Sequence, residues 1–340
     1  MRAAAATVLV TVLVALLAGC HGADAAPDRP YADVAAALQA NLDADPTGLY
    51  RNLEAVALTV DGRTVYQRYR RGFTSDTPAD VDAVRTTVLS SLVGIALADG
   101  DLPGLDARLG DLLPHRRMPA DVSAVTLRQL LGMTAGLMQD DAYAAQVADV
   151  PARERVAWVL THGLVAEPGE RFAYSGADTL LLTAVLEQAT GRTVDAYARE
   201  KLYGPLGLTD RAGLTDRAGL TVHDLVTLGQ LWLDRGTWYG RPLVPAAWVD
   251  AMSTQYVFTG TTEKFPGYGF AVWTDAAGGH PAIAAAGRGG QLVEVVPDLK
   301  LVAVFVSVLT PDTTAADLVG VAGATNYSDL VDVLIAPRLP

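Results

Sequence analysis

Hydroxyl side chains are the first candidates for chemistry in this sequence, and several lie in the stretch "DAVRTTVLSSLVGIALADG", residues 82–100. A threonine or serine hydroxyl becomes a nucleophile only when an adjacent base takes its proton. Thr86 and Thr87 have no lysine or histidine near them in sequence, and no serine in the chain is followed three residues later by a lysine. The only lysines are Lys201, Lys264 and Lys300. The stretch therefore lacks a recognisable pair of nucleophile and base.

The other polar side chains of this stretch have simpler interpretations. Ser90 and Ser91 fall well inside an apolar helix, where small hydroxyls bond to backbone carbonyls. Arg85 keeps its proton at any usable pH and cannot serve as a base. A carboxylate-binding role and a solvated loop position are both open for Arg85.

No other catalytic pattern is present. The sequence has no G-x-S-x-G element, which excludes the nucleophile elbow of an α/β-hydrolase. The histidines after residue 21 are isolated, with neither H-E-x-x-H nor a paired spacing. They are His115, His162, His223 and His280. We therefore expect no metal and no cofactor.

Composition sets the broad class. With 340 residues, of which 50% are hydrophobic, the chain can bury a full core in one large domain or two closely packed ones. The formal net charge is -12 at pH 7. This charge argues against nucleic acid and anionic lipid as partners of the folded domain, because like charges repel.

The N-terminus has the features of a secretory signal. Arg2 precedes an apolar run over residues 3–17, and the run ends in Leu-Ala-Gly-Cys at Cys20. This ending resembles the bacterial lipoprotein signal, with an ordinary signal peptide as the alternative. We predict a signal peptide at 1–19, lipidation of Cys20, a tether at 20–30 and anchoring to the extracytoplasmic face of a membrane. Cys20 is the only cysteine, so no intrachain disulfide can form.

The rest of the chain, residues 31–340, is predicted to be one folded domain. Two strand-like runs flank Asp61-Gly62, a strong hairpin signal. Residues 82–252 are mainly helical by periodicity, with capping boxes at Thr126/Gln129 and Thr221/Asp224. The helix after Thr126 is expected to close at Gly136, and a helix over "ADTLLLTAVLEQATG" at Gly191.

Strand-like runs return after Pro266, and a last helix is predicted from Tyr327 to Ile335. Strands at both ends with helices between them predict an α+β fold: an antiparallel sheet flanked by helices, with an inserted helical lobe at about 82–252. A cleft between sheet and lobe is the natural site. The hexapeptide GLTDRA occurs at 207–212 and 213–218, and we interpret it as a local duplication in a surface loop.

Several blocks, in order, resemble the serine beta-lactamase and penicillin-binding-protein superfamily, in its class C-like esterase and 6-aminohexanoate-dimer-hydrolase branch. They include "LEAVALTVDGRTVYQRY", "SSLVGIALADGDL", "VTLRQLLGMTAGL", "PGERFAYSGADTLLLTAVLEQATGR" and "AAGRGGQLVEVVPDLKLVAVF". The resemblance covers nearly all of the chain after the signal. It implies the same α+β fold and, in active members, an acyl-serine mechanism.

The resemblance also shows what this chain lacks. The family's chemistry uses S-x-x-K, with serine and lysine on one helix face. Alignment on "LVGIAL" and the hairpin places the serine position at Ala83 and the lysine position at Thr86. Both chemical groups are replaced.

Two further family motifs are partly retained. The Y-x-N motif falls on Tyr174-Ser175-Gly176, so Tyr174 is kept as a candidate catalytic residue, with a packing role as the alternative. The third motif, K-T-G or H-x-G, matches Gly287-Arg288-Gly289, followed by Gly290. Glycines there let a ligand lie against a strand edge, or mark a bend in the sheet.

The family's oxyanion pocket uses backbone N–H groups, here those of Ala83 and Gly290, which do not depend on side chains. We therefore expect a ligand-binding cleft bordered by Ala83, Tyr174 and residues 287–290.

The sequence thus predicts an extracytoplasmic lipoprotein whose domain is a catalytically inactive homologue, with a small acyl, peptide or cell-wall ligand. An active ester, amide or beta-lactam hydrolase with a rearranged site, and a purely structural role, are the alternatives.

Overall fold

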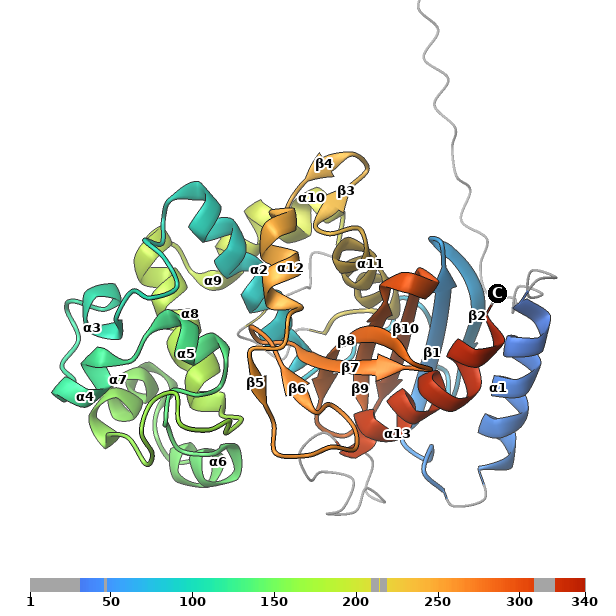
Figure 1. Cartoon of the computed structure of the whole chain (residues 1–340), viewed down its shortest axis with the longest axis horizontal. Coiled ribbons are helices and arrows are strands. Elements are labelled where there is room, and N and C mark those ends of the chain that lie inside the picture. Colours follow the sequence, from blue (N-terminus) through green and yellow to red (C-terminus); the bar gives the residue numbers. More distant parts are fainter. Residues whose placement is uncertain (1–30, 46–47, 209–213, 215–218, 309–321, 340) are drawn as a thin grey trace, which may run out of the picture.

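An antiparallel sheet and a helical lobe lie side by side (Figure 1). The computed structural model describes residues 31–45, 48–208, 214, 219–308 and 322–339. The predicted signal peptide, the tether with Cys20, and most of the GLTDRA duplication lie outside these residues. No helix within the described ranges has both the length and the apolar character that crossing a bilayer requires. The α+β prediction is confirmed.

Eight strands form the sheet in the order β2-β1-β10-β9-β8-β7-β6-β5, and each neighbouring pair is antiparallel. The predicted hairpin is the β1–β2 pair, whose turn residues Asp61 and Gly62 both have positive φ, 50° and 72°. The strands are β1 (Leu53–Val60), β2 (Arg63–Tyr69), β5 (Val257–Phe258), β6 (Gly267–Tyr268), β7 (Trp273–Ala277), β8 (His280–Gly287), β9 (Gln291–Val296) and β10 (Leu301–Ser307). A separate small hairpin joins β3 (Thr237–Trp238) to β4 (Arg241–Pro242).

Short helices make up the lobe, on the left of Figure 1. They are α3 (Leu109–Leu112), α4 (Ala120–Ala124), α5 (Leu127–Leu131), α6 (Asp140–Val147), α7 (Ala152–His162), α8 (Gly176–Thr190) and α9 (Val194–Ala198). A π-helical turn (Arg199–Tyr203) and α10 (Gly204–Leu206) follow α9. The helices α2 (Val84–Asp99) and α12 (Ala246–Met252) lie between this lobe and the sheet (Figure 1).

The two faces of the sheet are covered by different helices. On one face pack α1 (Ala32–Ala44), α13 (Ala322–Leu330) and the π-helical turn Val331–Ile335 that continues α13. On the other face pack α2 and α11 (Val222–Leu233), which join the sheet to the core of the lobe. Short 3-10 turns at Pro297–Leu299 and Ala336–Arg338 complete the fold.

Helix α2 is the buried centre of the molecule. Its residues from Val84 to Ala96 are buried except Arg85. Its hydroxyl side chains at 87, 90 and 91 donate hydrogen bonds to backbone carbonyl groups. Ser90 donates to the Phe270 carbonyl at 2.6 Å, as expected of a packing serine rather than a nucleophile. The Trp248 indole donates to the Ser90 carbonyl at 2.9 Å, and a Cβ at Gly94 would come within 2.1 Å of that indole ring. The buried part of α2 is therefore held in place by its contacts with Phe270 and with Trp248 of α12.

Most predicted helix boundaries are confirmed. Both capping boxes are present, and Gly191 ends α8 in a left-handed conformation. The prediction that this helix closes at Gly136 is wrong. Helix α5 ends at Leu131, because the backbone turns at Gly132 and then at Met133, whose φ is +53°. The predicted last helix begins at Ala322 instead of Tyr327.

A buried carboxyl group lies between the sheet and α13. Glu294 on β9 is 0% exposed, and its Oε1 accepts a hydrogen bond from Ser328 Oγ at 3.2 Å. Burial raises the pKa of Glu294 to about 8, although nearby Lys264 opposes the shift. The folded state therefore holds this proton far more tightly than an unfolded chain, in which a glutamate titrates near about 4.3.

Replacing this carboxyl should change how stability depends on pH. Because the folded pKa of Glu294 is raised, its contribution to the free energy of unfolding should fall as pH rises from about 4.3 to about 8, and level off above that. Glu294→Gln keeps a partner for Ser328 and removes this contribution. Urea unfolding at about pH 5 and about pH 8.5 should therefore show the variant gaining on wild type by a few kcal/mol. Exposed Glu263→Gln is the control, and parallel pH profiles for Glu294→Gln and wild type would refute the assignment.

Candidate functional site

The start of α2 lies at the edge of a cleft between lobe and sheet. Ala83 is the residue immediately before the helix and contributes only a methyl group there. Thr86 follows one turn later, and both line the cleft. The structure therefore places the predicted nucleophile and lysine positions together, as the sequence resemblance requires.

Thr86 is paired across the cleft. Its Oγ1 lies 3.4 Å from the hydroxyl of Tyr174 and 3.4 Å from the Thr179 hydroxyl on α8. Side chains from α2, α8 and the segment before α8 thus meet at one point. The Thr86 hydroxyl is thus the shared partner of the Tyr174 and Thr179 hydroxyls.

Tyr174 is held by aromatic packing. Its ring stacks on Trp273 at 5.8 Å with an interplanar angle of 10°, and meets Tyr268 edge-on. Burial raises the pKa of the Tyr174 hydroxyl far above its usual value, and the contact with Thr86 only partly opposes this shift. The raised pKa favours the protonated phenol, which can donate a hydrogen bond and is a poor general base.

Arg288 connects the third motif to both other parts of the site. Its backbone N–H donates to Asp82 Oδ2 at 2.7 Å, and its guanidinium lies 3.2 Å from Asp140 on α6. The other oxygen of Asp140 accepts from the Gly176 N–H at 2.9 Å, and the Asp140 N–H donates to the Tyr174 carbonyl at 3.1 Å. The β8–β9 turn, the start of α2 and the Tyr174 segment are therefore tied together.

Asp82 adopts a left-handed backbone conformation. Its φ is +43°, a left-handed value that aspartate tolerates better than most residues. This places the Asp82 carboxylate, directly before Ala83, against the β8–β9 turn.

The glycines of the third motif form the tight turn between β8 and β9. Gly289 and Gly290 have positive φ, 80° and 100°. The Gly290 N–H donates to the Gly287 carbonyl at 3.4 Å, and a Cβ at Gly290 would come within 2.7 Å of the Tyr327 ring. Of this motif, only Arg288 lines the cleft. The glycines serve close packing, and the oxyanion pocket stays a prediction.

The cleft is large enough for a small ligand, with a volume of about 920 Å³. Its walls come from the start of α2, from α6 and α7, from the Tyr174 segment, from β7 and from the β8–β9 turn. Within the described part of the chain, none of its lining residues is a serine, cysteine, histidine or lysine. The hydroxyls that border it belong to threonines and tyrosines.

The three lysines lie elsewhere. Lys201 pairs with Asp99 at 2.8 Å, Lys300 with Asp61 at 3.0 Å, and Lys264 with Asp332 at 3.2 Å. None of them therefore replaces the lysine that is missing at position 86. No three histidine, cysteine or acidic side chains of the described residues are grouped as metal ligands.

Sequence reasoning did not single out Asp82, Asp140, Arg155 or the aromatic residues of the cleft wall, Phe172 and Trp273. Asp82 and Phe172 have sequence neighbours, Ala83 and Tyr174, that carried a signal. Asp140 and Arg155 belong to helices with no motif, so folding alone brings them to the cleft. Arg85, left open by the sequence, lines the cleft in the first turn of α2 and pairs with Asp80.

Solved structures with the same architecture indicate the class of protein. A "putative beta-lactamase" from Bacteroides dorei is 18% identical, with a TM-score of 0.69 over 91% of this chain and 99% of that chain. A penicillin-binding protein homologue from Pyrococcus abyssi, an octamer, is also 18% identical, with a TM-score of 0.66 over 79% of this chain and 73% of that chain. The fold is that of the serine beta-lactamase and penicillin-binding-protein superfamily.

The family model named Beta-lactamase matches residues 53–322, and the chain belongs to this family. A curated relative, the "Putative D-alanyl-D-alanine carboxypeptidase" of Escherichia coli, strain K12, is 44% identical over 43 residues. This match covers 13% of the present chain and 10% of the relative. The chain thus spans about a tenth of the length of the curated relatives that it matches.

The Asp82 contact can be tested by mutation. Asp82→Ala removes the acceptor of the Arg288 N–H and puts alanine at a left-handed position, so we expect the free energy of unfolding to drop by about 1–3 kcal/mol. Asp82→Asn keeps an acceptor oxygen and tolerates the conformation, so it should lose less. Urea denaturation measures both, and an Asp82→Ala variant as stable as the wild type would show that the contact does not stabilise the fold.

Proposed function

We propose that this protein is an extracytoplasmic lipoprotein, anchored through Cys20, whose beta-lactamase-like domain binds a small acyl, peptide or cell-wall ligand without hydrolysing it. The observation that carries this proposal is the composition of the cleft. Its nucleophile position is Ala83, its lysine position is Thr86, and no serine, cysteine, histidine or lysine lines it within the described residues. The chain is a family member without the chemical groups of the family's reaction.

The size of the loss supports inactivity. In subtilisin, removing the serine nucleophile costs about a million-fold in turnover. This corresponds to about 8 kcal/mol of transition-state stabilisation. The polar side chains that remain in the cleft include neither the serine nor the lysine of the family's reaction.

The arginines of the cleft could receive a ligand carboxylate. Arg85, Arg155 and Arg288 line the cleft with Asp82 and Asp140, and Asp80 pairs with Arg85, so a ligand carboxylate would compete with these aspartates. Asp140 already places a carboxylate on the Arg288 guanidinium at 3.2 Å, in the arrangement that a ligand carboxylate would adopt. We infer that a ligand carboxylate binds next to Arg288.

One observation favours a second function, an active hydrolase with a rearranged site. The Thr86 hydroxyl lies 3.4 Å from Tyr174 and borders the cleft. However, the raised pKa of Tyr174 keeps the phenol protonated, so it cannot take the threonine proton. The other candidate bases that line the cleft are Asp82 and Asp140, and both already accept hydrogen bonds from Arg288.

Covalent probes separate the two functions. Wild-type protein incubated with a fluorophosphonate or a penicillin should show no added mass, because no activated nucleophile lines the cleft. Ala83→Ser with Thr86→Lys restores both groups at the start of α2, and we expect it to gain an adduct at position 83. Intact-protein and peptide mass spectrometry read out both results.

The single variant Ala83→Ser is the matched control, because it supplies a hydroxyl without a base and should react far more slowly than the double variant. An adduct on any cleft residue of the wild type would overturn the inactive assignment. Ester turnover by the wild type that disappears in Tyr174→Phe would do the same and favour the rearranged hydrolase.

The lipid anchor has its own test. Expressed in a bacterium fed labelled palmitate, the full chain should take up label and sediment with membranes. Cys20→Ala should lose the label and the sedimentation, since Cys20 is the only cysteine of the chain. Processing of the wild type without label would instead support the ordinary signal peptide.

A further inference from the structure

The loop between β5 and β6, residues 259–266, connects the cleft to a separate group of charged side chains. Thr259 at the start of this loop lines the cleft, as does Trp273 on β7. Lys264, near the end of the loop, lines a neighbouring hollow with a volume of about 930 Å³. One short loop therefore contributes to the cleft at one end and to the hollow at the other.

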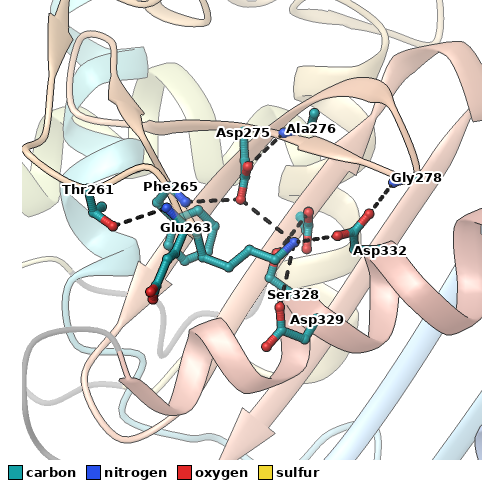
Figure 2. Close-up of polar contacts among 11 residues, drawn as sticks. Thr261, Glu263, Phe265, Asp275, Ala276, Gly278, Ser328, Asp329 and Asp332 are labelled. Carbon is teal, nitrogen blue, oxygen red and sulfur yellow. Dashed lines mark hydrogen bonds and ion pairs between the residues drawn. The ribbon is translucent and has the colours of Figure 1, made fainter.

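The Lys264 ammonium joins this loop to two other elements (Figure 2). It lies 3.2 Å from Asp332, in the π-helical turn after α13, and 3.9 Å from Asp275 on β7. A third carboxylate, that of Asp329 on α13, lies 3.8 Å away. The side chains of Lys264 and Asp275 are only 13% and 8% exposed, so salt and water screen their attraction weakly. These charges therefore hold the loop, the strand and the helical segment together.

Two of the aspartates also bind backbone groups. Asp275 Oδ2 accepts a hydrogen bond from the Phe265 N–H at 3.0 Å, and Asp332 Oδ1 accepts one from the Gly278 N–H at 2.6 Å. Glu294 on β9 interacts electrostatically with Lys264, but burial raises the pKa of Glu294 to about 8, so this carboxyl keeps its proton at neutral pH. At neutral pH the ammonium is therefore balanced by the aspartates rather than by Glu294.

Phe265, the residue after Lys264, has a strained backbone. Its φ is +54°, in the left-handed region that a bulky residue rarely adopts. Such a conformation persists only where the surrounding contacts hold it. For Phe265 these contacts are the hydrogen bond to Asp275 and the packing of a ring that is 1% exposed. The strain would therefore move the loop if these contacts were weakened.

Aromatic contacts connect Phe265 to the cleft. Its ring lies 5.7 Å from that of Trp273, between centroids. Trp273 in turn stacks on Tyr174 at 5.8 Å, and the Tyr174 hydroxyl lies 3.4 Å from that of Thr86. A shift of Phe265 therefore reaches the wall of the cleft through two ring contacts.

From these contacts we propose that Lys264 is a latch for the cleft: its ion pairs with Asp275 and Asp332 hold Phe265 in the strained conformation, and Phe265 sets the position of Trp273 in the cleft wall. Lys264 lies outside the cleft and is a positioning residue. Without its charge, three carboxylates face one another across the hollow and repel, and the loop relaxes away from β7 and α13. The shape of the cleft is thus controlled from outside it.

Lys264→Met tests the latch in the full, unliganded chain. Methionine keeps much of the carbon chain and removes the ammonium. Hydrogen exchange of peptides that cover residues 259–266, measured by mass spectrometry, should speed up by about tenfold or more, because breaking a buried ion pair leaves its partners uncompensated. Lys264→Arg keeps the charge and should keep the slow exchange.

The fluorescence of Trp273 gives a readout that an ion pair confined to the loop would not change. It is obtained as the difference between each protein and the same protein carrying Trp273→Phe. In Lys264→Met this emission should shift to the red and be quenched more strongly by acrylamide, because the indole loses its contact with Phe265. Lys264→Arg should show the wild-type emission.

Two further variants complete the test. Lys300→Met is the matched control, because Lys300 also pairs with an aspartate, Asp61, at 3.0 Å, on the β1–β2 turn. It should change neither readout. Asp332→Asn is a milder change that removes one charge and keeps an acceptor for the Gly278 N–H, and it should change both readouts in the direction of Lys264→Met.

Unchanged exchange and unchanged emission in both Lys264→Met and Asp332→Asn would refute the latch. Faster loop exchange with an unchanged Trp273 emission would also refute it, because the ion pairs would then hold the loop without positioning the cleft wall. Neither measurement uses a ligand. A failed latch therefore leaves the proposed binding function intact, and a failure to bind any ligand leaves the latch intact.

Discussion

The burial of α2 between sheet and lobe is the constraint on which the rest of the structure depends. Its apolar side chains each contribute about 1.5–3 kcal/mol when fully buried. Ser90 also donates a hydrogen bond to the Phe270 carbonyl, and the Ser90 carbonyl accepts one from the Trp248 indole. A single polar contact at its start, such as that of Asp82 with Arg288, contributes about 1 kcal/mol. Packing therefore fixes where Ala83 and Thr86 lie, whatever their side chains can do chemically.

A cleft at this place can therefore persist whether or not the family's serine and lysine are present. The walls around the start of α2 are held by the stacking of Tyr174 on Trp273 and by the Arg288–Asp140 pair. Neither interaction involves a nucleophile. The proposed binding in the cleft would depend on charge and shape, which the fold maintains, whereas the family's reaction, as the resemblance implies, uses two side chains that Ala83 and Thr86 replace here.

Much of the fold could be predicted from local patterns. The hairpin at Asp61-Gly62 and the capping boxes at Thr126 and Thr221 are confirmed, because turn and cap chemistry act over a few residues. The predicted end of α5 and the predicted start of α13 were wrong. The end of α5 is set by distant segments, because the Leu131 carbonyl accepts from the Ala271 N–H and the Met133 carbonyl from the Ala173 N–H, both at 2.8 Å.

For the site, the sequence by itself determined which groups are absent: it has alanine at 83, threonine at 86 and no serine followed three residues later by lysine. Side-chain chemistry is fixed by residue type, so folding cannot restore it. Only the tertiary structure decided which side chains surround Ala83 and Thr86. Asp140 and Trp273 carry no motif, and they reach the cleft because packing brings separate elements together.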